Sequence, residues 1–100
     1  MAENPTPADL NSPEFQSQLF SLERTLLVQV VDVLGRLRRT GWNDLYRSPG
    51  FKWEKIGHVG SRGEALYSLR LTQKIRAVGF REGEFLRLIS LHPDHDSAYR

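Results

Sequence analysis

The sequence predicts an α+β domain in which an N-terminal helix, or a helical hairpin, packs on a 3–4-stranded antiparallel sheet. Apolar residues recur at helical spacing between residues 13 and 40, and the period changes to two after residue 50. The segments with period two are joined by very short loops, which are typical of neighbouring antiparallel strands. These observations favour a sheet with one face covered by the preceding helices.

Length and composition limit the number of domains and the cellular environment. A chain of 100 residues with 39% hydrophobic residues can build one core. We expect residues 1–12 to form a flexible N-terminal arm and residues 13–100 to form a single domain. The chain has no cysteine, which excludes disulfides and thiolate sites. It has no apolar run near the roughly 20 residues that span a bilayer, and its start lacks the pattern of a secretory signal. We therefore expect a cytoplasmic protein without a membrane partner.

Charge is distributed unevenly along the chain. Residues 1–50 carry five Lys/Arg and six Asp/Glu, whereas residues 51–100 carry nine Lys/Arg, six Asp/Glu and all three histidines. A basic C-terminal half favours an anionic partner.

The helical segment has recognisable ends. Residues 12–14 (Ser-Pro-Glu) supply a hydroxyl cap, a proline at the first position and an acid near the positive helix end. Ser21 lies within the periodic run and can cap a second helix, so one long helix and a hairpin are both compatible with the sequence. Three arginines before Gly41 are typical of a helix C-terminus, and residues 41–50 are expected to form a loop.

Four strands are expected at residues 52–58, 65–71, 74–80 and 84–91. The last hairpin is expected to turn at residues 81–84, pairing the first of these residues with the last, with Gly83 at a positive φ. A three-residue loop at 72–74 places Arg70 opposite Arg76. A two-residue loop would instead place a charge on the aliphatic face, so burial favours the longer loop.

This register gives the sheet two different faces. The aliphatic face, expected to lie under the helices, comprises Leu69, Leu71, Ile75, Ala77, Leu86 and Leu88. The opposite face carries Ser68, Arg70, Arg76, Phe80, Phe85 and Arg87. Like charges paired across strands destabilise a sheet by a few tenths to roughly 1 kcal/mol. The arginine pair therefore indicates either a phosphate-sized anion site or neutralisation by Glu54 or Asp94. Arginines beside aromatic rings are also what single-stranded RNA recognition uses.

The chain ends in HPDHDSAYR, residues 92–100, which concentrates groups able to transfer protons. Zinc needs three or four converging ligands, and His58 is the only histidine outside this segment, so we expect neither a metal nor another cofactor. His92 or His95 can act as acid or base near neutral pH, and Tyr99 can stack or donate a proton. The alternative is a polar turn in which aspartates bond backbone amides.

The stretch LYSLRLTQKIRAVGFREGEFLRLISLHPDHDSAY, residues 66–99, resembles the C-terminal half of the RelE/ParE superfamily of bacterial toxins from toxin–antitoxin systems. The shared pattern is a Tyr-x-hydrophobic-Arg strand, an arginine followed by apolar residues, a short hairpin, and a histidine-containing tail that ends in tyrosine. With the helical segment in its expected place, the resemblance covers about three-quarters of the chain.

The resemblance implies a toxin that cleaves messenger RNA, usually on the ribosome, without a metal, and that is neutralised by a cognate antitoxin protein. The residues that match catalytic positions are Arg76, Arg70, His95 with His92 as alternative, Tyr99 and Glu54. The residues expected to bind RNA are Arg70, Arg87, Phe80, Phe85 and Lys52. In this mechanism the ribose 2′-hydroxyl attacks the adjacent phosphate, and Arg76 would stabilise the phosphorane-like transition state.

Two departures from the family pattern narrow this expectation. Many members begin with a β-strand, whereas MAENPTPADL is not expected to form one. Ser68 stands where some members carry a catalytic lysine, so that variant of the mechanism is not expected here. A gyrase-poisoning toxin of the ParE type and a non-catalytic RNA- or protein-binding module of the same fold remain as alternatives.

Overall fold

The structure is a computed structural model that describes residues 5–93. It contains three helices and five strands within this range. In chain order they are β1 (Ala8–Asp9), α1 (Pro13–Phe20), α2 (Arg24–Arg38), α3 (Trp42–Arg47), β2 (Glu54–Val59), β3 (Ala65–Arg70), β4 (Arg76–Glu82) and β5 (Phe85–His92). None of the helices in residues 5–93 combines the length and apolar character needed to cross a membrane.

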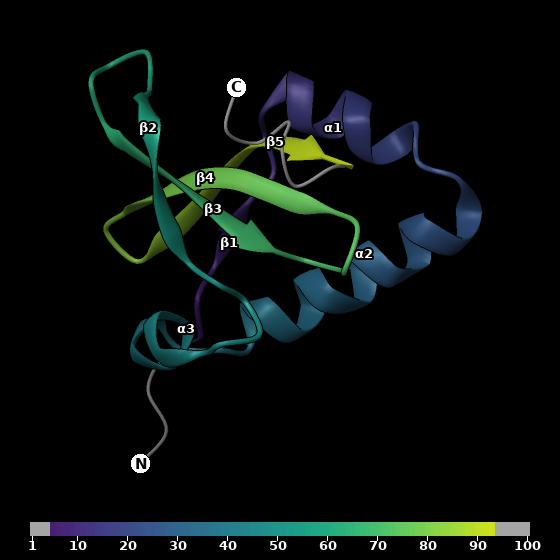
Figure 1. Cartoon of the computed structure of the whole chain (residues 1–100), viewed down its shortest axis with the longest axis horizontal. Helices are drawn as coiled ribbons and strands as arrows, with labels where there is room; N and C mark the ends of the chain where they lie inside the picture. The colour runs from purple at the N-terminus through teal and green to yellow at the C-terminus, as the bar shows by residue number, and fades with distance from the viewer. Residues whose placement is uncertain (1–4, 94–100) are drawn as a thin grey trace.

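The strands form one sheet in the order β1-β5-β4-β3-β2 (Figure 1). Strands β2 to β5 pair antiparallel in sequence order, and β1 pairs parallel with β5. Helices α1 and α2 precede this meander in the chain. The predicted α+β class is confirmed, and the sheet has one short parallel strand in addition to the expected antiparallel ones.

The helical segment forms two helices. Ser12 caps α1, its hydroxyl accepting from the Phe15 amide at 3.2 Å, and Pro13 occupies the first turn as predicted. Ser21 ends α1, and the second cap comes from Glu23, whose carboxylate accepts from the Leu26 amide at 3.1 Å. The alternative of one long helix is therefore excluded.

Helix α3 lies where a loop was expected. Its first residue, Trp42, is 3% exposed and Leu45 is fully buried. Residues three apart lie on the same face of a helix, so a single turn buries both side chains. The glycine and proline residues on either side of this segment led to the prediction of a loop. The helix forms because it buries Trp42 and Leu45.

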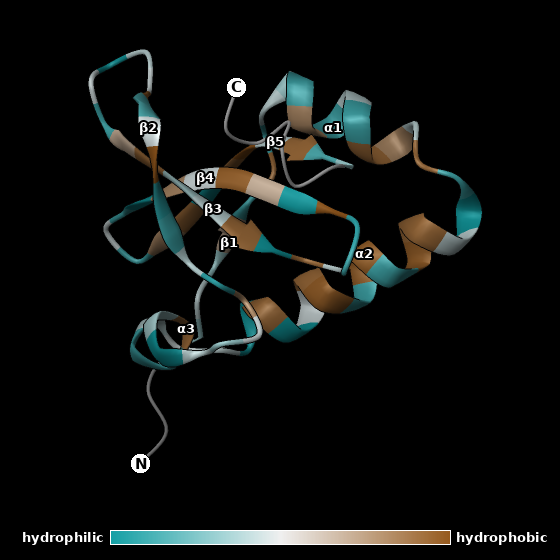
Figure 2. Cartoon of the chain, in the orientation of Figure 1, coloured by the Kyte–Doolittle hydropathy of each residue, from teal (hydrophilic) through white to brown (hydrophobic). Residues whose placement is uncertain are grey.

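The main core lies between the helices and one face of the sheet, and Figure 2 shows apolar residues along α2 and along β3, β4 and β5. Its buried members are Phe15, Leu19, Val30, Leu34, Leu37, Trp42, Leu45, Phe51, Leu69, Leu71, Ile75, Ala77, Leu86, Leu88 and Leu91. All six residues predicted for the aliphatic face belong to this core. A second, small cluster of Ile56, Leu66 and Val78 lies on the other face, which we call the outer face.

Strand β1 corrects the expectation that the first ten residues contain no strand. Ala8 pairs with Leu86, whose amide donates to the carbonyl of Pro7 at 2.9 Å. The amide of Thr6 donates to the carbonyl of Arg38 at 3.0 Å, and Thr6 is fully buried. Backbone groups make these contacts, so the polar, proline-containing sequence forms the strand without an apolar side-chain pattern.

The predicted register between β3 and β4 is confirmed, with Arg70 opposite Arg76. The register predicted between β4 and β5 is wrong. Glu82, not Arg81, begins the turn, and it pairs with Phe85. Gly83 has a φ of 62° within the resulting two-residue loop. The difference of two positions near the turn leaves each side chain on its predicted face.

A β-bulge changes the register further along the same pair. Gly79 pairs with Leu88, whereas Val78 pairs with Ser90, so Ile89 is an additional residue in β5. A Cβ atom at position 79 would clash with the carbonyl oxygen of Arg87, so the close approach of the two strands requires glycine there. Beyond the bulge, β5 continues with its faces exchanged.

Candidate functional site

The bulge places His92 on the outer face of the sheet, directly opposite Arg76. Because Arg76 also pairs with Arg70, these three residues form one row across β3, β4 and β5. We call them the arginine row. Without the additional residue, His92 would lie on the core face, so the local backbone irregularity creates this grouping.

A second row lies beside the first and supplies oxygen atoms. Glu54 on β2 pairs with Ser68 on β3, which pairs with Val78, and Val78 pairs with Ser90 on β5. The structure thus brings together four of the predicted site residues from four strands. Ser68 and Ser90 join them, and no sequence motif had indicated a role for either serine.

Arg76 is the most buried charged residue of this site, with 3% exposure. Its Nη2 atom donates to the Ser68 hydroxyl at 3.3 Å and lies 3.7 Å from a carboxylate oxygen of Glu54. Ser68 is fully buried, whereas the side chain of Glu54 is 49% exposed. The neutralisation by Glu54 that the sequence analysis offered as an alternative is therefore present. Arg70 is only partly buried, so its guanidinium remains accessible to a phosphate group.

His92 has the features of a neutral proton acceptor. Its Nε2 atom lies 2.9 Å from the Ser90 hydroxyl. Burial lowers the pKa of His92 below its ordinary value, and the negative charge of Glu14 in α1 opposes this effect in part. A lowered pKa keeps the imidazole uncharged near neutral pH, the form that can take a proton from a hydroxyl group.

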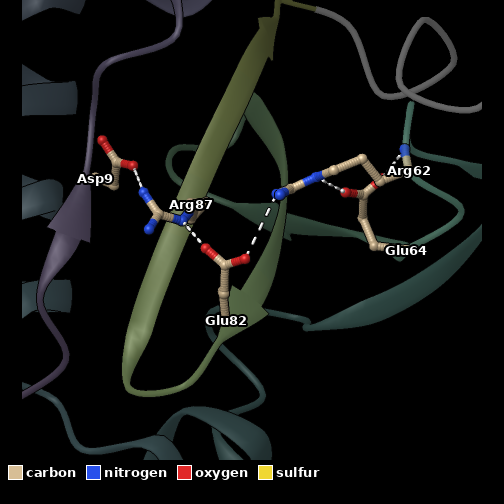
Figure 3. Close-up of polar contacts among 5 residues, drawn as sticks. All are labelled: Asp9, Arg62, Glu64, Glu82 and Arg87. Carbon is tan, nitrogen blue, oxygen red and sulfur yellow. Dashed lines mark hydrogen bonds and ion pairs between the residues drawn. The ribbon is translucent and has the colours of Figure 1, made fainter.

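Arg87 lies on the predicted face, beside Phe80 and Phe85, and belongs to a network of ion pairs. It forms ion pairs with both Asp9 and Glu82, and Glu82 is in turn paired with Arg62 at 3.4 Å (Figure 3). Arg62 also pairs with Glu64 at 3.5 Å, so five charged residues form a chain of ion pairs from β1 to the loop before β3. The hydrogen bond that Arg87 donates to Glu82 raises the pKa of Arg87 above its ordinary value.

The predicted aromatic RNA contacts are also separate from the arginine row. Phe80 pairs with Arg87, four residues along β4 from Arg76, or about 13 Å at the usual strand rise. Phe80 packs on the small outer cluster, and Phe85 is 46% exposed with the Arg87 guanidinium 5.4 Å from its ring centre. Lys52 precedes β2 with a φ of 49°, an uncommon conformation for a residue with a side chain.

Two predicted residues, His95 and Tyr99, lie outside the described residues. Within residues 5–93 no group of three His, Asp or Glu side chains is placed to hold a metal ion. The spacing of the core leucines in the last strand indicates the bulge that groups Ser90 with His92. Leu86 and Leu88 are two residues apart, as in a regular strand, whereas Leu88 and Leu91 are three apart.

Solved structures similar to this chain include a bacterial toxin. No family model matches the chain, and no curated protein matches it. A crystal structure of a copper-bound mutant toxin from Helicobacter pylori is similar over 92% of this chain and 97% of that chain, with 15% sequence identity and a TM-score of 0.48.

Proposed function

We propose that the protein is the toxin of a toxin–antitoxin pair and that it cleaves messenger RNA as a metal-independent endoribonuclease. The observation that carries this proposal is the arginine row, in which Arg70 and Arg76 lie beside the uncharged histidine His92. The resemblance of residues 66–99 to the RelE/ParE superfamily supports it, and also supports the ribosome as the place of action and an antitoxin protein as the neutralising partner.

The chemistry requires a base, an acid and a cation beside one phosphate. A base removes the proton of the ribose 2′-hydroxyl, the oxygen attacks the adjacent phosphorus, and the bond to the 5′-oxygen breaks as an acid protonates it. The products are a cyclic 2′,3′-phosphate and a free 5′-hydroxyl. We assign the base to His92, with Glu54 as the second candidate, and the acid to His95 or Tyr99. Arg70 contacts the phosphate, because guanidinium groups suit the charge that develops on its oxygens.

Arg76 acts in this proposal as a positioning residue. With 3% exposure it has little surface to offer a phosphate, and it holds Glu54 and Ser68. Its positive charge lies 3.7 Å from a carboxylate oxygen of Glu54 and contributes to the field at the neighbouring Arg70. This role differs from the direct transition-state contact that the family resemblance implies for Arg76.

The test compares the wild-type chain with Arg70→Ala and His92→Gln. Removing one group that stabilises developing charge costs a factor of about 10²–10³ in rate. We expect purified wild-type protein to cleave RNA in the presence of EDTA and each variant to cleave it more slowly by that factor. Induced in bacteria, the wild type arrests growth and both variants fail to do so. Arg47→Gln, on the exposed side of α3, is the matched control with an unchanged rate.

Full toxicity of folded Arg70→Ala and His92→Gln would contradict the proposal. The low exposure of Arg76 favours a second candidate, a non-catalytic toxin such as a gyrase poison, in which the arginine serves the fold. Bulk translation and DNA supercoiling after induction separate the two. An early loss of translation supports RNA cleavage, and an early change in supercoiling supports gyrase poisoning.

A further inference from the structure

An aromatic pocket lies at the side of the sheet next to α3, apart from the arginine row. It has a volume of about 340 Å³, and its wall includes Tyr46, Trp53, Glu64, Tyr67, Phe80 and Arg81. These residues come from α3, from the segment before β2, from β3 and its preceding loop, and from β4. The volume lies near the lower end of the range for small-molecule sites, about 300–1,000 Å³. We call this feature the aromatic pocket.

The rings of the pocket form a fixed stack. Trp53 and Tyr67 are parallel within 11°, with ring centres 4.6 Å apart. Behind them, Trp42 meets Trp53 edge to face at 5.5 Å, and its Nε1 donates to the carbonyl of Glu84 at 2.8 Å. Because Trp42 is 3% exposed, the core holds the stack in place from behind. Tyr46 is 47% exposed and presents its ring to solvent.

Arg81 is also held in one orientation at this site. Its guanidinium lies over the rings of Trp42 and Tyr46, 4.6 Å and 5.9 Å from their centres. It donates to the Tyr46 hydroxyl at 2.9 Å, to Glu84 at 3.0 Å and to the carbonyl of Gly83 at 2.7 Å. The guanidinium of Arg81 therefore already has an orientation in which it can lie beside an aromatic ligand.

Glu64 contributes a negative group to the same pocket. The backbone amide of Arg62 donates to its carboxylate at 3.0 Å, and this hydrogen bond lowers the pKa of Glu64. The carboxylate is therefore ionised near neutral pH and accepts hydrogen bonds without donating any. The pocket thus offers aromatic faces, a cation and an anionic acceptor.

This combination selects the chemical class of the ligand. An aliphatic ligand would remove water from the two charged groups without offering either a new hydrogen bond, which costs free energy. A cationic side chain would be repelled by the positive charge of Arg81. A nucleobase has a flat face for the rings and N–H groups for Glu64, and bases of single-stranded RNA are bound in this manner by proteins. We propose that the aromatic pocket binds one unpaired nucleobase of single-stranded RNA, preferring bases that carry an amino group. This inference rests on the proposed RNA substrate.

The position of the pocket fits a contact on the same RNA strand as the arginine row. Phe80 belongs both to the wall of the pocket and to the strand that carries Arg76, four residues away. A base bound here is thus distant from the reacting phosphate and contributes to the register of the RNA, so its loss is expected to raise KM with little change in kcat.

The direct test measures quenching of tryptophan fluorescence by the four nucleoside monophosphates and by a short single-stranded RNA with 2′-O-methyl groups, which it cannot cleave. The variants are Tyr46→Leu and Trp53→Leu, and the control is Phe20→Leu, which is 73% exposed at the end of α1. Stacking of a base on an aromatic ring contributes about 1–3 kcal/mol, or roughly 5- to 150-fold in affinity. We expect a loss in this range for both variants and none for the control. Because Trp53 is also a probe, binding to Trp53→Leu is measured by anisotropy of labelled RNA.

Glu64→Gln tests the base preference. It keeps an oxygen that can accept from the Arg62 amide but removes the charge, so we expect the preference for AMP, CMP and GMP over UMP to fall while UMP binding stays unchanged. Unchanged RNA affinity in folded Tyr46→Leu would overturn the inference. If the same variant also loses antitoxin binding, the pocket is assigned to a protein partner instead. If RNA binds through the pocket but is not cleaved, the proposed ribonuclease function fails and the base-binding site stands.

Discussion

Arg76 and Arg87 lie on neighbouring antiparallel strands and were both predicted to act on RNA, yet the structure places them in opposite environments. Arg76 is 3% exposed and contacts Glu54 at 3.7 Å. The side chain of Arg87 is 36% exposed and is paired with two carboxylates (Figure 3). Among the contacts described within residues 5–93, the more buried arginine thus has the longer ion pair, and the more exposed one is paired with two carboxylates.

This difference shows that the number of ion pairs is a poor guide to what an arginine contributes. Ion pairs near the surface are screened by water and salt and contribute little to stability. A guanidinium enclosed by the protein fills volume and satisfies buried oxygens, so its removal leaves a cavity and a serine hydroxyl without its donor. We expect Arg76 to matter for both fold and site, and Arg87 mainly for holding β1 against β5.

The largest effect is expected for Arg76→Ala. The loss of a nearly buried side chain together with its polar contacts is expected to lower the free energy of unfolding by about 2–4 kcal/mol. Arg76→Met keeps most of the volume, and Glu54 can turn to solvent because it is 49% exposed, so this variant is expected to recover much of the loss. Urea denaturation followed by circular dichroism measures both.

A loss below about 1 kcal/mol in Arg76→Ala would contradict the buried position of its side chain. The two variants also separate an effect of Arg76 on folding from an effect on function. A loss of toxicity in Arg76→Ala alone does not distinguish unfolding from a loss of catalysis. A folded Arg76→Met protein without toxicity would assign the effect to the charge.

The fold class and the faces of the strands could be predicted because each depends on a repeated side-chain pattern. Burial selected the loop that pairs Arg70 with Arg76, and the structure has this pair. The same rule predicted the inner face between the turn and the bulge even though the hairpin register was two positions off, since a slip of two keeps every residue on its face.

The composition of the site could be predicted only in part because it depends on backbone events. The bulge next to Gly79 lies where two strands approach closely, and it moves His92 into the arginine row. Strand β1 is held by hydrogen bonds of the main chain, which leave no side-chain period. The aromatic pocket joins residues from α3, the loop before β2 and two strands, and none of these segments shows the grouping by itself.

An intermediate effect is expected from the protonation of His92. Burial lowers its pKa in the folded state, so the unfolded chain binds the proton more tightly. The contribution of the neutral histidine to stability is therefore complete above the unfolded pKa of about 6.5. It is lost as the pH falls from there through the lower, folded-state pKa, because charging the imidazole favours unfolding.

Urea denaturation between pH 5 and pH 8 tests this expectation, with His92→Gln and His58→Gln as a matched pair. His58 is exposed on β2, so its replacement is expected to leave the pH dependence as in the wild type. His92→Gln is expected to remove the decline between pH 8 and pH 5. A wild-type decline that persists unchanged in His92→Gln would show that another group causes it.

The smallest effect is expected for Arg87→Gln, and its dependence on salt is the informative quantity. At 0.01 M salt the screening length is about 30 Å, and at 1 M it is about 3 Å. We expect a small loss of stability at low salt, smaller than that of Arg76→Ala. The loss shrinks at high salt because the substitution removes the ion pairs with Asp9 and Glu82, together with the contact to the half-exposed Phe85 ring. Arg47→Gln, whose pair with Asp44 is exposed on α3, is expected to show almost no change at either salt concentration. An equal loss of stability for Arg87→Gln at both concentrations would mean that the aliphatic part of Arg87 packs as a core residue does. Arg76 and Arg87 would then stabilise the fold by the same kind of packing and differ only in the size of the effect.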